Sequence, residues 1–508
     1  MQISGTDRRQ MQYISLEELV AQDSIVRIID AFVDTQDLKA LGFDRTEAAE
    51  TGRPGYAADP LVKLYVYGYY SSLRSSRKLH KETTCNIEVK WLLNELSPDY
   101  KTISEFRRIN IRPLQKLLRE FERLCQSWGL IGGELFALDG TKIKASNNKK
   151  QNYSKKKLRE RLTRIEKKIE EYLLSSEEDE GQDEKGSEAL KGLKEMLERK
   201  EQYEAYLSHL ETSGENEISI VDPDARLMGN NRGGVEVSYN VQCVVDGKHD
   251  IIVDYDVTTN PSDQGYLSIM VKRLKRKGYR RFTLTADKGY FNGECLQKAK
   301  RYKVKAIVAR QDPSNPKGQP EEFHSEKFQY QDEIDAYLCP KGELLPRRSG
   351  KTIERRRYFD KKACARCEHV SICAPGKKGY RTVSRGEYAS IYEEADLNYK
   401  ENREIYRRRQ EMVEHPFGTI KHTMNGGYFL LRTRRKVRAE VALLMLGYNL
   451  RRAVSVLGFG EIMARLNNLT GSFSCFSSFK KLFTSLFDSI MPVNDVYHSK
   501  LYLVEVVP

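Results

Sequence analysis

The order of apolar, β-prone runs between residues 134 and 310 most constrains what this chain can fold into. The first run, "ELFALDGTKIKA", begins at Glu134 and ends in polar residues. Two more, "VEVSYNVQCVVD" and "HDIIVDYDVTT", are joined by "DGK", a hairpin signal. A fourth run, "FTLTADKGY", leads into a helical stretch at 292–302, which "KVKAIVAR" follows. This order of strand, hairpin, strand, helix and strand predicts a mixed sheet of an α/β protein.

Two carboxylates follow strands of this sheet, and a third lies in a later helical stretch. Asp139 follows the apolar residues of the first run and Asp287 those of the fourth, and we expect each at the exit of its strand. Glu414 lies in "EMVEHPFGTIKH", within a basic helical stretch. Carboxylates brought together in this way can hold Mg²⁺, and two such ions can clamp the oxygens of a phosphoryl displacement. A lone Asp at a strand end is more commonly a turn or cap residue, so the ordered set of three carries the prediction.

The charge balance indicates a polyanionic partner. The formal net charge is +14, which most simply suits nucleic acid, although charge alone also fits a basic protein without such a partner. No run approaches 18 consecutive apolar residues and the N-terminus lacks a signal pattern, so we expect no membrane span and a reducing compartment. The nine cysteines are then thiols or metal ligands rather than disulfides.

Changes in composition predict five segments. The first is helical and basic, which suits DNA binding, with an ordinary helical scaffold as the alternative. The two halves of the mixed-sheet core follow, the first interrupted by a charged helical hairpin and the second carrying the helix of Glu414. A solvated excursion is the simpler role for the hairpin. The expected limits are 1–130 for the helical domain, 131–310 for the first core part with the hairpin at 155–212, 311–395 for a cysteine-bearing insert, 396–460 for the second core part, and 461–508 for a tail of unassigned role.

Four cysteines in the insert form a candidate zinc site. Cys364 and Cys367 have a metal-ligand spacing, and Cys339 lies in a knuckle-like "CPKG" turn, but neither Cys339 nor Cys373 has a close partner in sequence. Four thiolates could bind a structural Zn²⁺ and stabilise a small insert that lacks a large core. Buried thiols without metal remain the alternative.

The stretch 400–438 is the most basic part of the core. A basic helix that follows a phosphate backbone gains affinity from counterion release. Within it, Glu414 would repel DNA unless it bound a cation, which favours a metal ligand. An ordinary helix-face pairing of Glu414 with Arg407 or Arg408 is the alternative.

Together these residues give the chain a resemblance to bacterial insertion-sequence transposases of the DDE, RNase H-like type. It resembles the branch with an N-terminal helical domain and a cysteine-bearing insert, over roughly residues 10–455. The matching segments are "LDGTKIKA", "DPDARLM", "YNVQCVVD", "TADKGYF" and "VEHPFGTIKH". The resemblance implies an α/β (α+β) fold with an RNase H-like mixed-sheet core. It also implies that Asp139, Asp287 and Glu414 are catalytic and bind two Mg²⁺ or Mn²⁺ ions.

Many such enzymes carry a Tyr, Arg, Glu, Lys signature around the last carboxylate. Glu414 and Lys421 keep the usual six intervening residues. Tyr406 and Arg409 keep the usual two between them, but four residues rather than three separate Arg409 from Glu414. The resemblance therefore assigns Lys421 firmly, and Tyr406 and Arg409 more loosely, to the transposon end. Glu411 is a rival metal ligand, but it does not keep the spacing to Lys421.

The function implied by the resemblance is DNA transposition. The protein would bind terminal inverted repeats as a homodimer, cut the element ends and join their 3′ hydroxyls to target DNA, with Arg407 and Arg408 among the DNA-binding residues. It would act in the bacterial cytoplasm at the nucleoid, without a membrane. The alternatives are an RNase H-like nuclease that cuts without joining, a zinc-bearing DNA-binding protein derived from a transposase but not catalytic, and, from residues 155 to 210 alone, a coiled-coil adaptor.

Overall fold

The computed structural model describes residues 13–47, 55–178, 183–229, 233–310, 319–349 and 356–469. The chain divides into two compact units. Residues 1–67, 76–106 and 453–508 form the first, and residues 68–75 and 107–452 form the second. The segment expected as a tail, 461–508, lies outside the described residues from 470 onward.

The first unit is helical in its described part, as the sequence predicted. Ser24 caps the amphipathic α2 by accepting a hydrogen bond from the Val26 N–H. Residues on most sides of α4 are buried, and the hydroxyl of one of them, Tyr65, donates to the carbonyl oxygen of Ile103 at 2.6 Å. The helices here are α1 (Leu16–Leu19), α2 (Ile25–Asp34), α3 (Leu38–Leu41), α4 (Ala58–Tyr70), α5 (Ser76–Cys85), α6 (Ile87–Leu92) and α7 (Tyr100–Ile109), of which α4 and α7 run on into the second unit.

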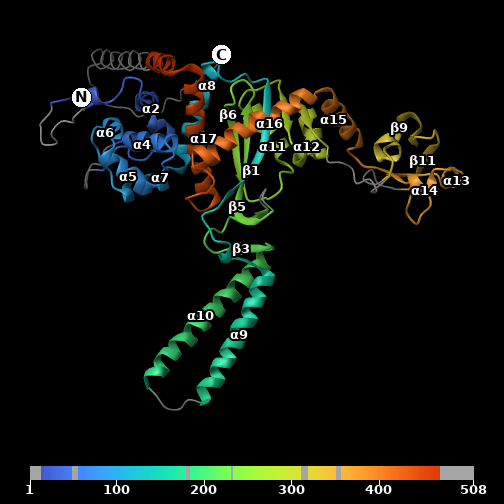
Figure 1. Cartoon of the computed structure of the whole chain (residues 1–508), viewed down its shortest axis with the longest axis horizontal. Coiled ribbons are helices and arrows are strands. Elements are labelled where there is room, and N and C mark those ends of the chain that lie inside the picture. The colour runs from blue at the N-terminus through green and yellow to red at the C-terminus, as the bar shows by residue number, and fades with distance from the viewer. Residues whose placement is uncertain are drawn as a thin grey trace, which may run out of the picture. The chain divides into compact units, whose positions relative to one another are not determined.

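The second unit is built on a mixed sheet (Figure 1). Its central strand β1 (Leu135–Lys144) pairs antiparallel with β5 (Val235–Asp246) and parallel with β7 (Thr283–Ala286). Strand β8 (Lys305–Val308) continues the sheet parallel to β7. Both β6 (Ile252–Thr258) and β4 (Arg226–Gly229) pair antiparallel with β5. In this sheet β1 lies between the antiparallel strands β4, β5 and β6 on one side and the parallel strands β7 and β8 on the other. This arrangement is an RNase H-like core, and the predicted fold class is confirmed.

Two helices connect the strands on the parallel side of the sheet. The sequence predicted α12 (Gly293–Arg301), which links β7 to β8 as a parallel crossover requires. It did not predict α11 (Tyr266–Arg276), which links β6 to β7 and buries Leu267, Met270, Val271 and Leu274. That apolar spacing is helical, so the signal was present in the sequence. Helix α8 (Ile111–Ser127) also belongs to this unit, and its Glu122 pairs with Lys277 at 2.6 Å.

Helix α16 (Arg403–Gly418) contacts β1, β5 and β7 and lies across the sheet (Figure 1). It buries Met412 and Val413, and it continues into a π-helical turn at Thr419–Thr423. The next helix, α17 (Arg434–Leu457), is apolar because it lies largely inside the protein. Among the described residues no single helix is long and apolar enough to cross a membrane. One bent pair, formed by α17 and residues 459–469, meets the length and composition test only when its two helices are taken together.

A helical hairpin is inserted between β1 and β4. Strands β2 (Asn152–Ser154) and β3 (Glu217–Ser219) pair at its base, and α9 (Lys155–Glu178) and α10 (Asp183–Ser213) form its two arms (Figure 1). Its small core contains Tyr153, Leu158, Leu162, Ile165, Tyr203 and Leu210.

A second insert precedes α16 and contains a small antiparallel sheet. Tyr337, Leu345 and Tyr358 are central to its core. The connection to the RNase H-like core is α15 (Ala389–Glu401). The strands are β9 (Gln329–Gln331), β10 (Ala336–Leu338), β11 (Leu344–Ser349), β12 (Arg356–Tyr358) and β13 (Val383–Arg385), and the short helices are α13 (Lys361–Ala365) and α14 (Val370–Cys373).

Candidate active site

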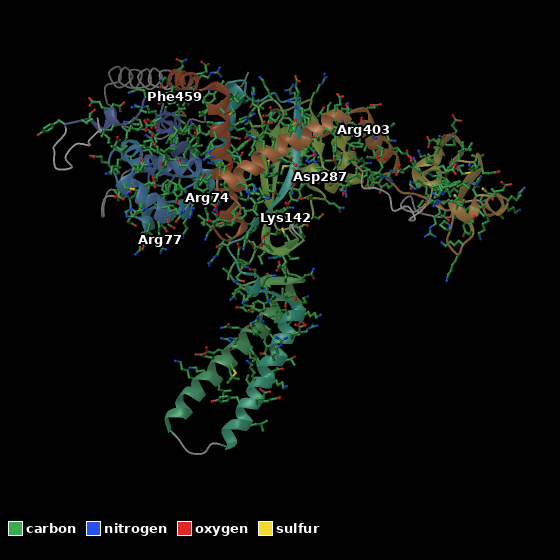
Figure 2. All side chains as sticks on the ribbon, viewed as in Figure 1. Arg74, Arg77, Lys142, Asp287, Arg403 and Phe459 are labelled. Carbon is green, nitrogen blue, oxygen red and sulfur yellow. The ribbon has the colours of Figure 1, made fainter. Side chains whose placement is uncertain are left out.

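Two aspartates lie side by side where β1 and β7 stop pairing. The parallel register runs as far as Leu138 and Ala286, and the next residues are Asp139 and Asp287. The chain turns at Asp287, as predicted, and Figure 2 labels this residue on the core. Asp139, however, is not at the exit of its strand, because β1 keeps pairing with β5 as far as Lys144. The parallel register therefore brings together two carboxylates that are far apart in the sequence.

The backbone next to each aspartate fixes its side chain. Asp139 Oδ1 accepts a hydrogen bond from the N–H of Gly140, and Asp287 Oδ1 accepts one from the N–H of Gly289, both at 2.8 Å. A Cβ atom at position 140 would lie 2.4 Å from Nε2 of Gln242, a distance at which real Cβ contacts are not found. Glycine is therefore required beside Asp139 because the buried amide of Gln242 comes so close.

The pKa of Asp139 is raised to about 6. Burial is the largest cause, and the negative charges of Asp287 and Asp263 raise the pKa further. The guanidinium of Arg409 opposes the shift, and its Nη1 lies 3.7 Å from Asp139 Oδ2. The site thus concentrates negative charge that one arginine only partly offsets, which is the electrostatic setting of a cation site.

Asp263 is a carboxylate at this site that the sequence analysis missed. It follows β6 in the loop "TTNPSDQG", and its Oδ1 accepts hydrogen bonds from the side-chain amides of Asn240 and Gln242, each at 2.7 Å. The Asn, Pro, Ser and Gly residues around it predict only a loop. The sequence does not show that this loop returns to β1.

Helix α16 brings two residues of the Tyr, Arg, Glu, Lys signature to the acidic pair. Arg409 pairs with Asp139, and its guanidinium lies 5.4 Å from the ring centre of Tyr406. Burial raises the pKa of Tyr406, and the charge of Asp287 adds to this shift. Both side chains therefore lie within electrostatic range of the aspartates, despite the extra residue before Glu414.

Lys421 also approaches Asp139, from the π-helical turn. Burial lowers the pKa of Lys421, and the charge of Asp139 works against that shift. The turn is closed by Gly426, whose N–H donates to the carbonyl oxygen of Ile420 at 2.7 Å. A Cβ at position 426 would lie 2.6 Å from that oxygen, so this close return of the chain requires glycine. π-Helical turns of this kind occur frequently at functional sites.

Glu414 and the neighbouring basic residues are arranged differently. Glu414 is exposed, and its Oε1 accepts a hydrogen bond from the side-chain amide of Gln410 at 2.8 Å. The rival residue Glu411 is exposed as well. The Arg408 guanidinium donates to the carbonyl oxygen of Gly247, whereas Arg407 is exposed. Within the described part of the chain, no three His, Cys, Asp or Glu side chains are close enough together to form a metal site.

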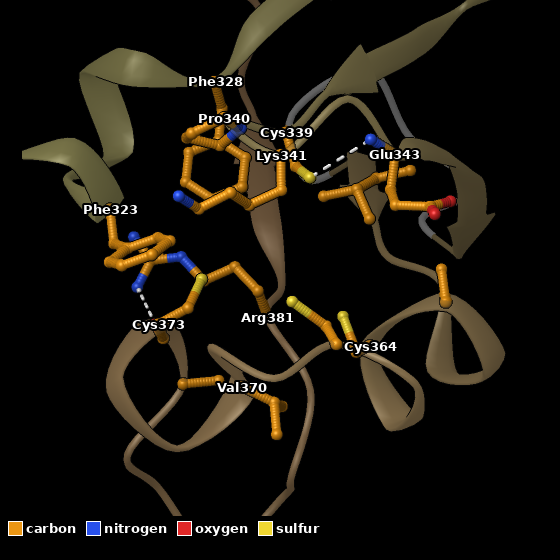
Figure 3. Close-up of a pocket in the computed structure, with 14 residues that line it drawn as sticks. Phe323, Phe328, Cys339, Pro340, Lys341, Glu343, Cys364, Val370, Cys373 and Arg381 are labelled. Carbon is orange, nitrogen blue, oxygen red and sulfur yellow. Dashed lines mark hydrogen bonds between the residues drawn. The ribbon is translucent and has the colours of Figure 1, made fainter.

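The cysteines of the insert line one pocket (Figure 3). The sulfur atoms of Cys339, Cys364 and Cys373 point into it, and Cys367 also contributes to its lining. Burial raises the pKa of Cys364 and of Cys373, and the neighbouring cysteines raise both pKa values further. The fold therefore gathers the four thiols named from the sequence.

Comparison with known proteins gives two family matches. Residues 14–108 match a family described as a transposase domain (DUF772), and residues 214–450 match a transposase DDE domain. The second match includes Asp287 and Glu414, while Asp139 lies outside it. No curated protein matches the chain.

Among solved structures, the chain is similar to a piggyBac transposase in a synaptic complex with hairpin DNA. The two share 10% sequence identity, and the match covers 93% of this chain and 84% of that one. The TM-score is 0.27, a value too low to support a structural argument.

Proposed function

Because the chain belongs to the DDE transposases of insertion sequences, enzymes that bind DNA, cleave it and transfer its strands with divalent metal ions, we propose that Asp139, Asp287 and Glu414 hold those ions here. The observation that carries this proposal is the parallel register that makes Asp139 and Asp287 neighbours. Mg²⁺ and Mn²⁺ are hard ions that prefer carboxylate oxygens, so the donor set fits them.

The raised pKa of Asp139 supports the same conclusion. Without a cation, ionised Asp139 is opposed by burial and by the charges of Asp287 and Asp263. A bound divalent ion would relieve this repulsion, polarise the scissile phosphate and activate the attacking oxygen. The acid-rich site is therefore suited to bind metal, while Arg409 limits the excess charge.

The residues around the aspartates would position DNA. Arg409 and Lys421 are cations close to Asp139 and could hold phosphates on either side of the scissile bond. Tyr406, next to Arg409, offers a ring and a hydroxyl to the transposon end. Arg407 and Arg408, also on α16, would contact the phosphate backbone of the bound DNA. In the reaction, hydrolysis frees a 3′ hydroxyl at the element end, and this hydroxyl then attacks a target phosphodiester, so no covalent enzyme intermediate is needed.

Glu414 would complete the metal site if its side chain gave up the hydrogen bond from Gln410. The two side chains are one helical turn apart, and a hydrogen bond between exposed groups is easily exchanged for a metal ligand. Glu414→Gln should then abolish strand cleavage while leaving binding to the element ends intact. The matched control is Glu411→Gln, which removes one exposed carboxylate from the same helix and should cut normally. The opposite pattern would assign the third ligand to Glu411.

The pocket in the insert supports a second metal proposal. We propose that Cys339, Cys364, Cys367 and Cys373 bind a structural Zn²⁺, because they line one pocket and thiolates are preferred zinc ligands.

We also propose how the protein binds DNA and a second copy of itself. The N-terminal helices would read the terminal inverted repeats, and a homodimer would hold two element ends together in the bacterial cytoplasm, at the nucleoid. Light scattering of the protein with and without end DNA would test the dimer, since a complex of one chain with one end would contradict it.

A further inference from the structure

Asp263 lies near both aspartates of the site. A Cβ at position 140, directly after Asp139, would be 2.8 Å from Asp263 Oδ1. A Cβ at position 289, in the turn after Asp287, would be 3.0 Å from Asp287 Oδ1 and 3.7 Å from Asp263 Oδ2. Gly140 therefore makes room for this third carboxylate, whereas a Cβ at position 289 would be only in ordinary van der Waals contact with it.

Buried amides hold Asp263 in this place. Asn240 and Gln242 are 1% and 0% exposed, and both donate to the same oxygen of Asp263, Oδ1. Gln242 in turn accepts a hydrogen bond from the hydroxyl of the buried Tyr290. Each of these polar groups would be costly to bury without a partner, so together they fix the orientation of the carboxyl group.

The other oxygen of Asp263 stays available. Among the described residues, Oδ2 makes no hydrogen bond, and it is the oxygen on the side of Gly289 and Asp287. The carboxyl group is also close enough to Asp139 to raise its pKa. A loop anchor alone would be served as well by a neutral amide, which would avoid this like-charge repulsion.

We propose that Asp263 is a further carboxylate of the metal site, with Oδ2 accepting a hydrogen bond from a metal-bound water. This proposal rests on the proposed function of Asp139 and Asp287. It fits Mg²⁺, which keeps several of its waters in protein sites.

The test is Mn²⁺ binding to the full-length protein without DNA, measured by electron paramagnetic resonance. Asp263→Asn keeps an oxygen for Asn240 and Gln242 but replaces Oδ2 by a donor and removes the charge. We expect the affinity for Mn²⁺ to fall about 10- to 100-fold, as for other groups that orient metal ligands. Glu294→Gln is the charge-matched control, because Glu294 is exposed on α12 and its one ion pair among the described residues is with Lys298 at 2.5 Å. It should leave the affinity unchanged.

A second variant keeps the test valid if Asp263→Asn folds poorly. Asp263→Cys places a soft thiolate at the site, and the increase in melting temperature caused by Cd²⁺, relative to that caused by Mn²⁺, should exceed the wild-type ratio. Each protein is compared with its own metal-free melting temperature, so a less stable variant does not obscure the result.

Comparing Asp263→Asn with Asp287→Asn distinguishes the role of Asp263 from the existence of the metal site. Unchanged Mn²⁺ affinity in Asp263→Asn, with affinity lost in Asp287→Asn, would overturn the role of Asp263 alone. Unchanged affinity in both variants would overturn the proposed metal site as well.

Discussion

Arg409 Nη1 lies 3.7 Å from Asp139 Oδ2, and this pair joins helix α16 to the central strand of the core sheet. The arginine opposes a pKa shift that burial and two neighbouring carboxylates drive upward. The ionisation of Asp139 therefore reports both the negative charge of the site and the position of α16.

Metal binding should depend on pH through Asp139. Its pKa of about 6 means that a proton competes with the metal under mildly acidic conditions. Mn²⁺ affinity should be about tenfold weaker at pH 5 than at pH 7.5, because a carboxyl group of that pKa is then about nine-tenths protonated. Calorimetric titrations across this range measure the effect. An affinity that does not change with pH would contradict the role of Asp139.

The same shift predicts how the stability of the metal-free protein depends on pH. The pKa of Asp139 is higher in the folded state than in the unfolded state. Its titration therefore stabilises the folded state, and this contribution is complete at pH values below the unfolded pKa of about 4. That contribution is lost as the pH rises through about 6. Differential scanning calorimetry of wild type against Asp139→Asn isolates it, because the variant cannot titrate at this position. If the difference in melting temperature between the two proteins did not change from pH 4 to pH 7, the assignment would fail.

Replacing Arg409 should affect both ionisation and cleavage. Arg409→Gln removes the main charge that lowers the Asp139 pKa, so the pH midpoint of Mn²⁺ binding should move upward. Cleavage at saturating metal should fall by about 10²-fold, the usual cost of losing one group that stabilises developing charge. Arg409→Lys keeps the charge and should leave the midpoint closer to that of wild type. A downward midpoint in Arg409→Gln would contradict the ion pair.

A buried ion pair should stabilise the segment that follows Lys421. Glu440 is 0% exposed, lies 3.0 Å from Arg74 Nη1, and accepts hydrogen bonds from the N–H groups of Leu430 and Leu431. Glu440→Ala would leave Arg74 buried without its carboxylate, which should cost about 3–5 kcal/mol. Urea unfolding measures the loss.

The control for this prediction is Glu294→Ala, which breaks an exposed pair and should leave the free energy of unfolding nearly unchanged. Similar losses of unfolding free energy in both variants would show that the buried pair stabilises the protein no more than the exposed pair does. Glu440→Gln keeps an acceptor for the two N–H groups, so it should be less destabilising than Glu440→Ala.

The cysteine-bearing insert should contain about one zinc ion per chain. Cys367→Ser should lower the zinc content, measured by mass spectrometry of the purified protein, and should make the insert more sensitive to protease. Cys85→Ser is the matched control, since Cys85 is exposed on α5 of the first unit. Wild-type protein purified without zinc, yet resistant to protease, would contradict the proposal.

The strand pattern predicted five of the six core strands because each of them carries its own apolar signal, whereas the short strand β4 (Arg226–Gly229) was missed. The approach of Asp139 to Asp287 was expected because each follows an apolar run, although β1 continues past Asp139 as far as Lys144. Asp263 could not be predicted in this way, because a loop composition does not indicate which strand the loop returns to. The position of Glu414 depends on a side-chain rotamer on an exposed helix face, which a spacing rule does not specify.

Cleavage of a supercoiled donor plasmid that carries the element ends would test whether Asp287 takes part in metal-dependent strand cleavage. Wild type and Asp287→Asn would be compared with Mg²⁺, with Mn²⁺ and without metal, with binding to the ends measured in parallel. The catalytic role of Asp287 predicts metal-dependent cuts at the element ends by wild type, none by Asp287→Asn, and equal binding by both. Equal cutting by the two proteins, or no cutting by wild type despite retained binding, would contradict it.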